Sequence, residues 1–279
     1  MKMKMVMGLL ECVVFSLLTG CAGFRVEDAA DAHWRGRKVA FLGDSISDPN
    51  QKHAIYWQCL QRSMGIEPHV YAVSGYQWSH MLDMARKMKE REGDDLDAIL
   101  IFVGTNDYNA NVPLGSWWTV ADETADYNGE SVVSRRRTPD MNPGTVCGRI
   151  NAALGYLKSN WPDAQIVLMT PIHRAYAHFG PTNVQPPESF PNRGGVYFED
   201  YVKLIREAAD IWSVPVIDLY RESGLLPTEP SFAKCFRDKG GNDRLHPNAE
   251  GHRRLAELIR LRLRALPVLT NGAARNGSL

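Results

Sequence analysis

The sequence has no excess of charge of either sign. Its 279 residues contain 32 lysines and arginines against 32 aspartates and glutamates, which gives a formal net charge of zero at pH 7. No overall electrostatic field therefore draws the protein to nucleic acid or to an anionic surface, and we expect no nucleic-acid partner. Whatever the protein binds must be recognised locally.

Cysteine is also scarce, with five residues in the whole chain. Two of them, Cys12 and Cys21, lie in the N-terminal segment. The other three, Cys59, Cys147 and Cys235, are an odd number at wide spacings, which fits neither a disulfide framework nor a zinc site. One bridge at most is possible, and we expect buried or idle thiols, with no metal bound.

Long apolar runs are absent except at the N-terminus. Two lysines precede an apolar run that ends in LTGC at 18–21. Although Glu11 departs from the usual pattern, these features predict a secretory signal over 1–20. The alternative, a membrane-spanning helix, needs a longer run. The last four residues resemble the bacterial lipobox, which implies cleavage before Cys21 and a lipid anchor on its thiol, hence a membrane-anchored lipoprotein of the cell envelope, at the outer membrane or in the periplasm.

A single domain is expected to follow. Residues 21–36 are small and charged without an apolar period, which indicates a tether, and 269–279 read as a flexible tail. Between them, at 37–268, short apolar runs alternate with amphipathic stretches. The expected strands are 38–42, 69–73, 98–103, 165–169 and 214–219, and the expected helices are 54–64, 79–90, 145–159, 198–211 and 248–266. This alternation predicts a parallel α/β sheet covered on both faces.

Two segments are too long to be plain connections. The insertion at about 109–144 contains Asn128-Gly129 between two candidate strands, which predicts a β-hairpin projecting from the domain. A second excursion, at 171–197, is rich in proline and glycine. Long segments of this kind in a compact domain are often lids or binding walls.

Three polar or small residues follow predicted strands directly. Ser45 comes after the first strand, Gly75 after the second and Asn106 after the third. Because ligands of parallel sheets bind beyond the carboxyl ends of the strands, we expect all three along one edge. Two of them have a structural alternative. Ser45 could be a helix cap in a phosphate-binding loop, although the glycines and lysine of such a loop are missing, and Asn106 could be a turn residue.

A candidate base for Ser45 lies two hundred residues downstream. A serine hydroxyl is a useful nucleophile at neutral pH when an imidazole accepts its proton and an acid orients that imidazole. Asp243 and His246 are three residues apart in a turn before a helix, so their side chains can meet. Taken alone, they could simply begin and cap that helix.

Together these segments resemble the SGNH hydrolases, also called GDSL-type esterases. The resemblance rests on GDSI at 43–46, Gly75, GTND at 104–107 and DRLHP at 243–247, in that order. It implies a three-layer α/β/α sandwich with a flavodoxin-like parallel sheet, here with a hairpin insertion, and ester hydrolysis without a cofactor. By position it implies Ser45 as nucleophile, His246 as base, Asp243 as orienting acid, and an oxyanion hole made by Ser45, Gly75 and Asn106.

Aromatic residues lie close in the sequence to the segments that we expect at the carboxyl edge of the sheet. Candidate substrate-binding rings are Tyr76, Trp78, Tyr108, Trp117 and Trp118. Flat rings beside a polar site suit sugars, whereas a long-chain ester needs a continuous apolar channel. The alternative is that the rings pack the hairpin onto the domain.

Other polar residues are expected to have no special role. The arginines at 135–137 could meet a carboxylated or sulfated sugar, but such a run more often forms a solvated face. His173 and His178 could contact a substrate, but we expect solvated loop positions for them and a surface position for His252.

The sequence thus predicts a serine esterase that removes acetyl groups from a small-molecule or glycan ester. A lipase or thioesterase of the same family is the alternative within enzymes. A non-catalytic glycan-binding lipoprotein is the alternative from another class.

Overall fold

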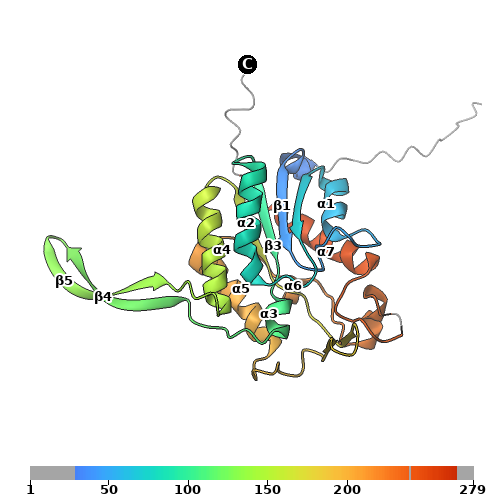
Figure 1. Ribbon diagram of the computed structural model, residues 1–279. Helices are drawn as coiled ribbons and strands as arrows, with labels where there is room; N and C mark the ends of the chain where they lie inside the picture. The colour runs from blue at the N-terminus through green and yellow to red at the C-terminus, as the bar shows by residue number, and fades with distance from the viewer. Residues whose placement is uncertain (1–28, 239, 269–279) are drawn as a thin grey trace, which may run out of the picture.

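The computed structural model describes residues 29–238 and 240–268. Its centre is a five-stranded sheet in the order β2-β1-β3-β6-β9, with every neighbouring pair parallel (Figure 1). The strands are β1 (Lys38–Gly43), β2 (Glu67–Ala72), β3 (Ala98–Phe102), β6 (Gln165–Met169) and β9 (Val216–Ile217). This strand order is flavodoxin-like, as predicted.

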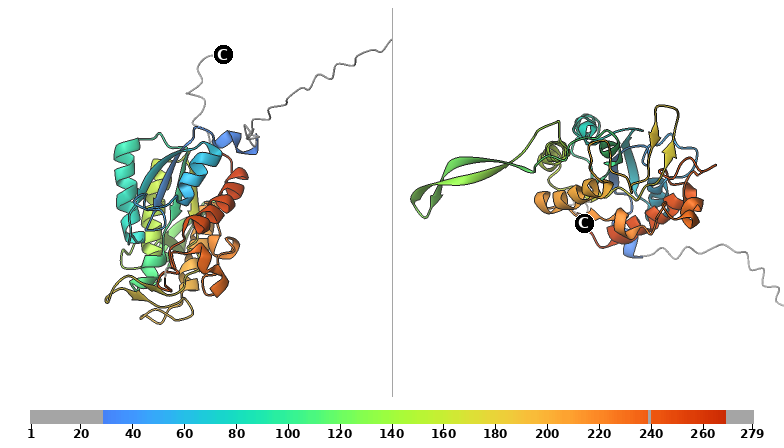
Figure 2. Two further views of the ribbon diagram at one scale, coloured as in Figure 1. Left: turned by 90° about the vertical axis from the view of Figure 1, so that its right-hand side faces the viewer. Right: turned by 90° about the horizontal axis from the view of Figure 1, so that it is seen from below.

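Helices cover both faces of the sheet, so the fold is the expected three-layer sandwich (Figure 2). One layer is built from α2 (Trp78–Glu92), α4 (Val146–Asn160) and α5 (Phe198–Trp212), and the other from α1 (Tyr56–Met64) and α7 (Ala249–Arg264). The short helix α3 (Thr105–Asn109) follows β3 at the carboxyl edge of the sheet.

Alternate residues of each strand enter the two cores. In β1, Ala40 and Leu42 pack with α2 and α4, while Val39 and Phe41 pack with α1 and α7, and all four are fully buried. A strand buried on both faces must be apolar throughout, which is why the run before Ser45 is recognisable in the sequence.

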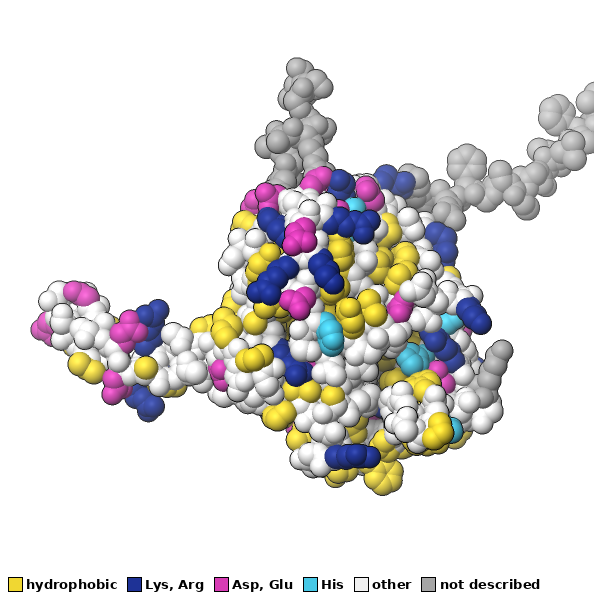
Figure 3. Space-filling view, in the orientation of Figure 1, with side chains coloured by type: hydrophobic (Ala, Val, Ile, Leu, Met, Phe, Trp, Pro, Cys, Tyr) yellow, Lys and Arg dark blue, Asp and Glu magenta, His cyan; other side chains and the backbone are white. Residues whose placement is uncertain are grey.

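The predicted hairpin is confirmed. Strands β4 (Trp118–Tyr127) and β5 (Glu130–Pro139) pair antiparallel and form an arm that projects away from the domain (Figure 1). Asn128 and Gly129 have φ angles of 60° and 89°, the left-handed backbone that a two-residue hairpin turn requires. Both charge signs are exposed along the arm (Figure 3).

The expectation of a tether over residues 21–36 is wrong for its described part. The 3₁₀ helix η1 (Ala29–Trp34) packs against α7: Trp34 is fully buried and donates a hydrogen bond to the Leu263 carbonyl at 2.9 Å. Asp31 pairs with Arg260 at 2.8 Å. The domain therefore begins by residue 29. The sequence did not indicate this, because η1 is too short to show a helical period of apolar residues and is held by one buried tryptophan.

Smaller differences lie in the second half of the chain. The strand expected at 214–219 is limited to β9, because α6 (Leu219–Glu222) begins at once with Asp218 as its cap. The excursion at 171–197 contains a short antiparallel pair, β7 (Ala177–His178) and β8 (Val184–Gln185). The helix η2 (Pro230–Cys235) was not predicted.

The predicted signal, the lipidation site Cys21 and the tail at 269–279 lie outside the described residues. No helix within 29–238 and 240–268 has the length and apolarity to cross a membrane. The three cysteines of the described domain are free thiols. Burial raises the pKa of the Cys147 thiol to about 12, so it stays protonated and unreactive at neutral pH.

Candidate active site

A tight turn after β1 presents Ser45 at the sheet edge. The Asp44 carboxylate accepts a hydrogen bond from the Ile46 amide at 3.0 Å, and Gln51 donates to the Ser45 carbonyl at 2.8 Å. A Cβ at Gly43 would lie 2.6 Å from the Ser47 hydroxyl oxygen, so the turn closes only with glycine there.

Ser45, His246 and Asp243 form a continuous hydrogen-bonded chain. Ser45 Oγ lies 2.9 Å from His246 Nε2, and His246 Nδ1 lies 3.1 Å from each carboxylate oxygen of Asp243. His246 and Asp243 are each 9% exposed. In this arrangement an imidazole can take the proton of the hydroxyl while the carboxylate holds the ring.

The turn that carries Asp243 and His246 is held by its own backbone. Asp243 Oδ1 accepts hydrogen bonds from the amides of Leu245 and His246 at 3.2 and 3.0 Å. Burial favours the neutral acid, but the hydrogen bonds from the His246 side chain and from these amides outweigh burial and lower the pKa of Asp243. Asp243 therefore stays ionised, as an orienting acid must.

The excursion at 171–197 supports the same turn. Ala177 of β7 forms a β-bridge with Asp243, and the Arg244 amide donates to the Tyr176 carbonyl at 3.0 Å. Phe179 then places its ring against that of His246, with centroids 5.2 Å apart. Sequence reasoning missed Phe179, since no pattern in a proline- and glycine-rich segment marks a contact with a residue about seventy positions away.

The candidate oxyanion donors follow three neighbouring strands, β1, β2 and β3. Among the described residues, no acceptor is paired with the backbone amides of Ser45 and Gly75. Gly75 has a φ of 85° and open space where a Cβ would stand, so a ligand can approach its amide. Asn106 donates one side-chain N–H to the Tyr76 carbonyl at 2.9 Å, which leaves its second N–H for a ligand.

Two acidic side chains, Asp48 and Asp107, hold the loops that carry the candidate oxyanion donors by accepting hydrogen bonds from them. Asp48 accepts hydrogen bonds from the amide and hydroxyl of Ser74 at 3.0 and 2.7 Å, which ties the Gly75 loop to the Ser45 loop. Asp107 accepts from the Trp78 amide at 3.0 Å and pairs with Arg149 at 2.9 Å.

Two of the acids near Ser45 hold a proton more tightly than usual because they are buried. Burial raises the pKa of Asp107 to about 6. Burial, with a smaller contribution from the negative charge of Asp107, raises the pKa of Asp44 to about 7. Asp44 is engaged with the backbone of the turn, and the base facing Ser45 is His246.

The candidate substrate-binding aromatics do not share one surface. Trp78 is 1% exposed inside the core, so its ring is not available to a substrate, contrary to the expectation from the sequence. Tyr108 is 2% exposed, and its hydroxyl donates to the Phe190 carbonyl at 2.8 Å. Tyr76 is half-buried and stacks on His80, with ring centroids 4.3 Å apart.

The tryptophan pair at 117–118 secures the base of the arm. Trp117 donates to Glu207 of α5 at 2.8 Å, and the Trp118 ring lies 5.1 Å from the guanidinium of Arg137. The Trp117 contact fits the alternative in which the rings pack the hairpin onto the domain, whereas the Trp118 contact lies within the hairpin itself.

The expected surface position of His252 is wrong. Its side chain is fully buried in α7 and stacks on Tyr56, and among the described residues neither ring nitrogen has a hydrogen-bond partner. Burial, together with the nearby His53 and Arg237, lowers the pKa of His252 to about 3, so the ring is neutral. The prediction was wrong because arginines follow His252 directly in the sequence, whereas the histidine itself lies on the apolar face of the helix.

Within the described residues, no group of three or more histidine, cysteine, aspartate or glutamate side chains is arranged to hold a metal ion. His173 is partly buried and contacts Glu188 at 2.5 Å, while His178 is exposed.

Comparison with known proteins agrees with this geometry. The GDSL-like Lipase/Acylhydrolase family model matches residues 41–254. No curated protein matches the chain. A solved protein from Lactobacillus plantarum is 27% identical, with a TM-score of 0.63 over 82% of this chain and 97% of that one.

More distant structures share the fold. A possible lipase from Chitinophaga pinensis is 16% identical, with a TM-score of 0.60 over 81% of this chain and 97% of its own. An acetyl xylan esterase is 20% identical, with a TM-score of 0.51 over 81% of this chain and 99% of its own.

Proposed function

The chain belongs to the GDSL-like lipase/acylhydrolase family, and from this premise we propose that it is a serine esterase that removes acetyl groups from carbohydrate. The observation that carries the proposal is the hydrogen-bonded chain from Ser45 Oγ through His246 to Asp243. In this chain a base faces the serine hydroxyl and a carboxylate orients the base, which is the arrangement that makes a serine nucleophilic at neutral pH.

The reaction proceeds through an acyl-enzyme. Ser45 Oγ attacks the ester carbonyl while His246 Nε2 takes its proton, and the negative oxygen that forms is bound by the N–H groups of Ser45, Gly75 and Asn106. His246 then gives its proton to the departing alcohol. Water then attacks the acyl carbonyl while losing a proton to His246, and His246 returns that proton to Ser45 Oγ as the acid departs.

The cavity behind the catalytic turn, which Ile46, Ile172 and Leu245 help to line, has a volume of about 10 Å³, roughly the space of one water molecule. No channel for a long alkyl chain therefore runs into the core at this point. An ester with a short acyl group needs no such channel, which favours acetate. The solved acetyl xylan esterase with the same fold adds support by analogy of fold alone.

The test compares acyl chain lengths and leaving groups. The purified protein is expected to release acetate from acetylated xylan or pectin, and to cleave 4-nitrophenyl acetate at least about ten times faster than the octanoate, because the cavity behind the catalytic turn has no room for the longer chain. Ser45→Ala is expected to lose both activities, while Ser131→Ala, which changes an exposed serine on the arm, retains them. A preference for the octanoate favours a lipase instead, and binding of glycans with no hydrolysis favours a non-catalytic lipoprotein.

We further propose that Cys21 anchors the protein to a membrane of the cell envelope. The first described segment, η1, lies at the opposite end of the domain from α3 and the catalytic edge (Figure 1, blue at the top and α3 below). An anchor attached before η1 would therefore join the domain at the end opposite the catalytic edge. Labelling of expressing cells with a palmitate probe is expected to mark the wild type and not Cys21→Ser; equal labelling refutes the anchor.

A further inference from the structure

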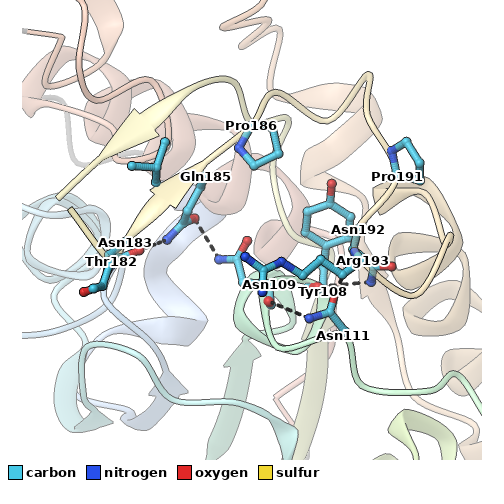
Figure 4. Close-up of a pocket in the computed structure, with 11 residues that line it drawn as sticks. Tyr108, Asn109, Asn111, Thr182, Asn183, Gln185, Pro186, Pro191, Asn192 and Arg193 are labelled. Carbon is cyan, nitrogen blue, oxygen red and sulfur yellow. Dashed lines mark hydrogen bonds between the residues drawn. The ribbon is translucent and has the colours of Figure 1, made fainter. Parts of the chain in front are cut away.

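A polar pocket lies beside the catalytic edge, between the end of α3 and the returning half of the second excursion (Figure 4). Its volume is about 410 Å³, in the range of small-molecule sites. Amides dominate its wall, and none of its lining residues is acidic. The wall includes Asn109, Asn111, Asn183, Gln185, Asn192 and Arg193.

A buried arginine fixes how the amides are turned. Arg174 is fully buried and donates to Asn109 Oδ1 and to Gln185 Oε1, both at 2.7 Å. Because a guanidinium can only donate, the oxygens of these two amides must face it. Asn109 Nδ2 donates to Gln185 Oε1 at 2.8 Å and Gln185 Nε2 donates to Asn183 Oδ1, so each of these two amides keeps one side-chain N–H for the pocket.

The other amide oxygens are also occupied by the protein. Asn183 Oδ1 accepts from Gln185 at 2.9 Å, and Asn111 Oδ1 accepts from the Arg193 amide at 2.7 Å. Asn192 Oδ1 accepts from two backbone amides of its own loop. Both side-chain N–H groups of Asn192 are used as well, by the Tyr108 carbonyl and the Tyr201 hydroxyl. The N–H donors left for a ligand therefore come from the other amides of the wall, Asn109, Asn111, Asn183 and Gln185, and they suit a ligand rich in oxygen acceptors.

The Arg193 side chain adds a positive charge. It extends across the pocket towards Asn109 (Figure 4), and in the described part of the chain its guanidinium takes part in no ion pair. A planar guanidinium beside neutral donors is typical of carboxylate recognition.

The pocket and the triad share the same β-hairpin. Strand β7 bridges Asp243 and leads to Phe179, which contacts His246, while β8 carries Gln185 into the pocket wall. On the other side, Asn109 lies one turn after Asn106 on α3. The pocket wall is therefore built on the same two elements that carry groups of the catalytic edge, so a polymer bound in the pocket can extend toward that edge.

We propose that this pocket binds a carboxylated sugar residue of the polysaccharide that carries the acetyl ester, with Arg193 pairing with the carboxylate and the amide N–H groups binding hydroxyl oxygens. The inference rests on the proposed function for the ester chemistry, but the binding itself needs no hydrolysis. The substrate is accordingly an acidic polysaccharide.

Calorimetric titration tests the binding directly. Ser45→Ala protein is expected to bind unacetylated trigalacturonate at least about ten times more tightly than xylotriose, since a hydrogen bond to a charged group discriminates by roughly this factor or more. Adding Arg193→Gln is expected to abolish the preference, and adding Arg86→Gln, which changes an exposed arginine on α2, is not. Equal affinity for the two sugars, or equal effects of the two arginine changes, overturns the proposal.

A kinetic measurement separates this inference from the esterase proposal. In the wild type, kcat/KM for acetylated oligogalacturonide is expected to exceed that for acetylated xylo-oligosaccharide, and in Arg193→Gln the ratio falls through a higher KM for the acidic substrate. Hydrolysis of 4-nitrophenyl acetate without selective binding of trigalacturonate refutes the pocket alone. Selective binding without any hydrolysis refutes the esterase alone.

Discussion

Replacing Asp243 by asparagine separates its charge from its shape. In Asp243→Asn, the new side chain keeps an oxygen for the amides of Leu245 and His246, which donate to Asp243 Oδ1 at 3.2 and 3.0 Å in the wild type. With that oxygen held by the backbone, the new NH₂ group faces His246 Nδ1, which must then accept. The ring proton moves to Nε2, where it points at Ser45 and blocks general-base catalysis.

The expected cost is about 10⁴-fold in kcat, the size seen when an orienting aspartate is replaced in this way. Asp243→Ala introduces no NH₂ group at this position. The ring proton can then stay on His246 Nδ1 and be donated to water, so activity falls less than in Asp243→Asn. It leaves two buried backbone amides without an acceptor, however, at roughly 1 to 3 kcal/mol each. Asp243→Asn is thus the less active variant, and Asp243→Ala the less stable one.

Steady-state hydrolysis of 4-nitrophenyl acetate and urea unfolding, run on both variants and on His246→Ala, test this reasoning. His246→Ala is expected to be as inactive as Asp243→Asn or more so. The reasoning fails if Asp243→Asn keeps more than a tenth of the wild-type kcat, or if Asp243→Ala unfolds at the same urea concentration as Asp243→Asn.

Single residues elsewhere carry three further predictions. Asn106→Ala is expected to lower kcat about 100-fold or more with little change in KM, and an unchanged kcat removes it from the oxyanion hole. Trp34→Ala is expected to cost about 3 to 5 kcal/mol in urea unfolding, whereas a residue in a tether costs almost nothing. His252 has a pKa of about 3 in the folded state and about 6.5 when unfolded, so the unfolded state binds more protons below pH 6.5 and stability falls as pH falls. Between pH 7.5 and 5.0 the wild type is expected to lose about 2 kcal/mol more than His252→Leu, and identical losses refute this.

The central sheet was predictable because parallel strands buried on both faces are continuous apolar runs. Gln165–Met169 was predicted with the bounds of β6, and Asn128-Gly129 located the turn of the arm. By contrast, 29–34 is a single short 3₁₀ helix, and its one apolar anchor, Trp34, gives no periodic signal.

The candidate site was also predictable only in part. Ser45, Asp243 and His246 were recognisable because each follows a strand or precedes a helix in a short motif, and the structure brings them into contact. Trp78 was assigned to the substrate on its position after Gly75, but the first turn of α2 faces the core. The polar pocket is invisible in the sequence, because segments about eighty residues apart build it around a buried arginine.

The measurement that tests the account most directly is covalent labelling of the protein with a fluorophosphonate probe, followed by peptide mass spectrometry. The account predicts a single adduct on Ser45, lost in Ser45→Ala and strongly reduced in His246→Ala, because the hydroxyl reacts only when the imidazole nitrogen 2.9 Å away can accept its proton. Absence of label on Ser45 in active wild-type protein, or equal labelling with and without His246, would contradict it.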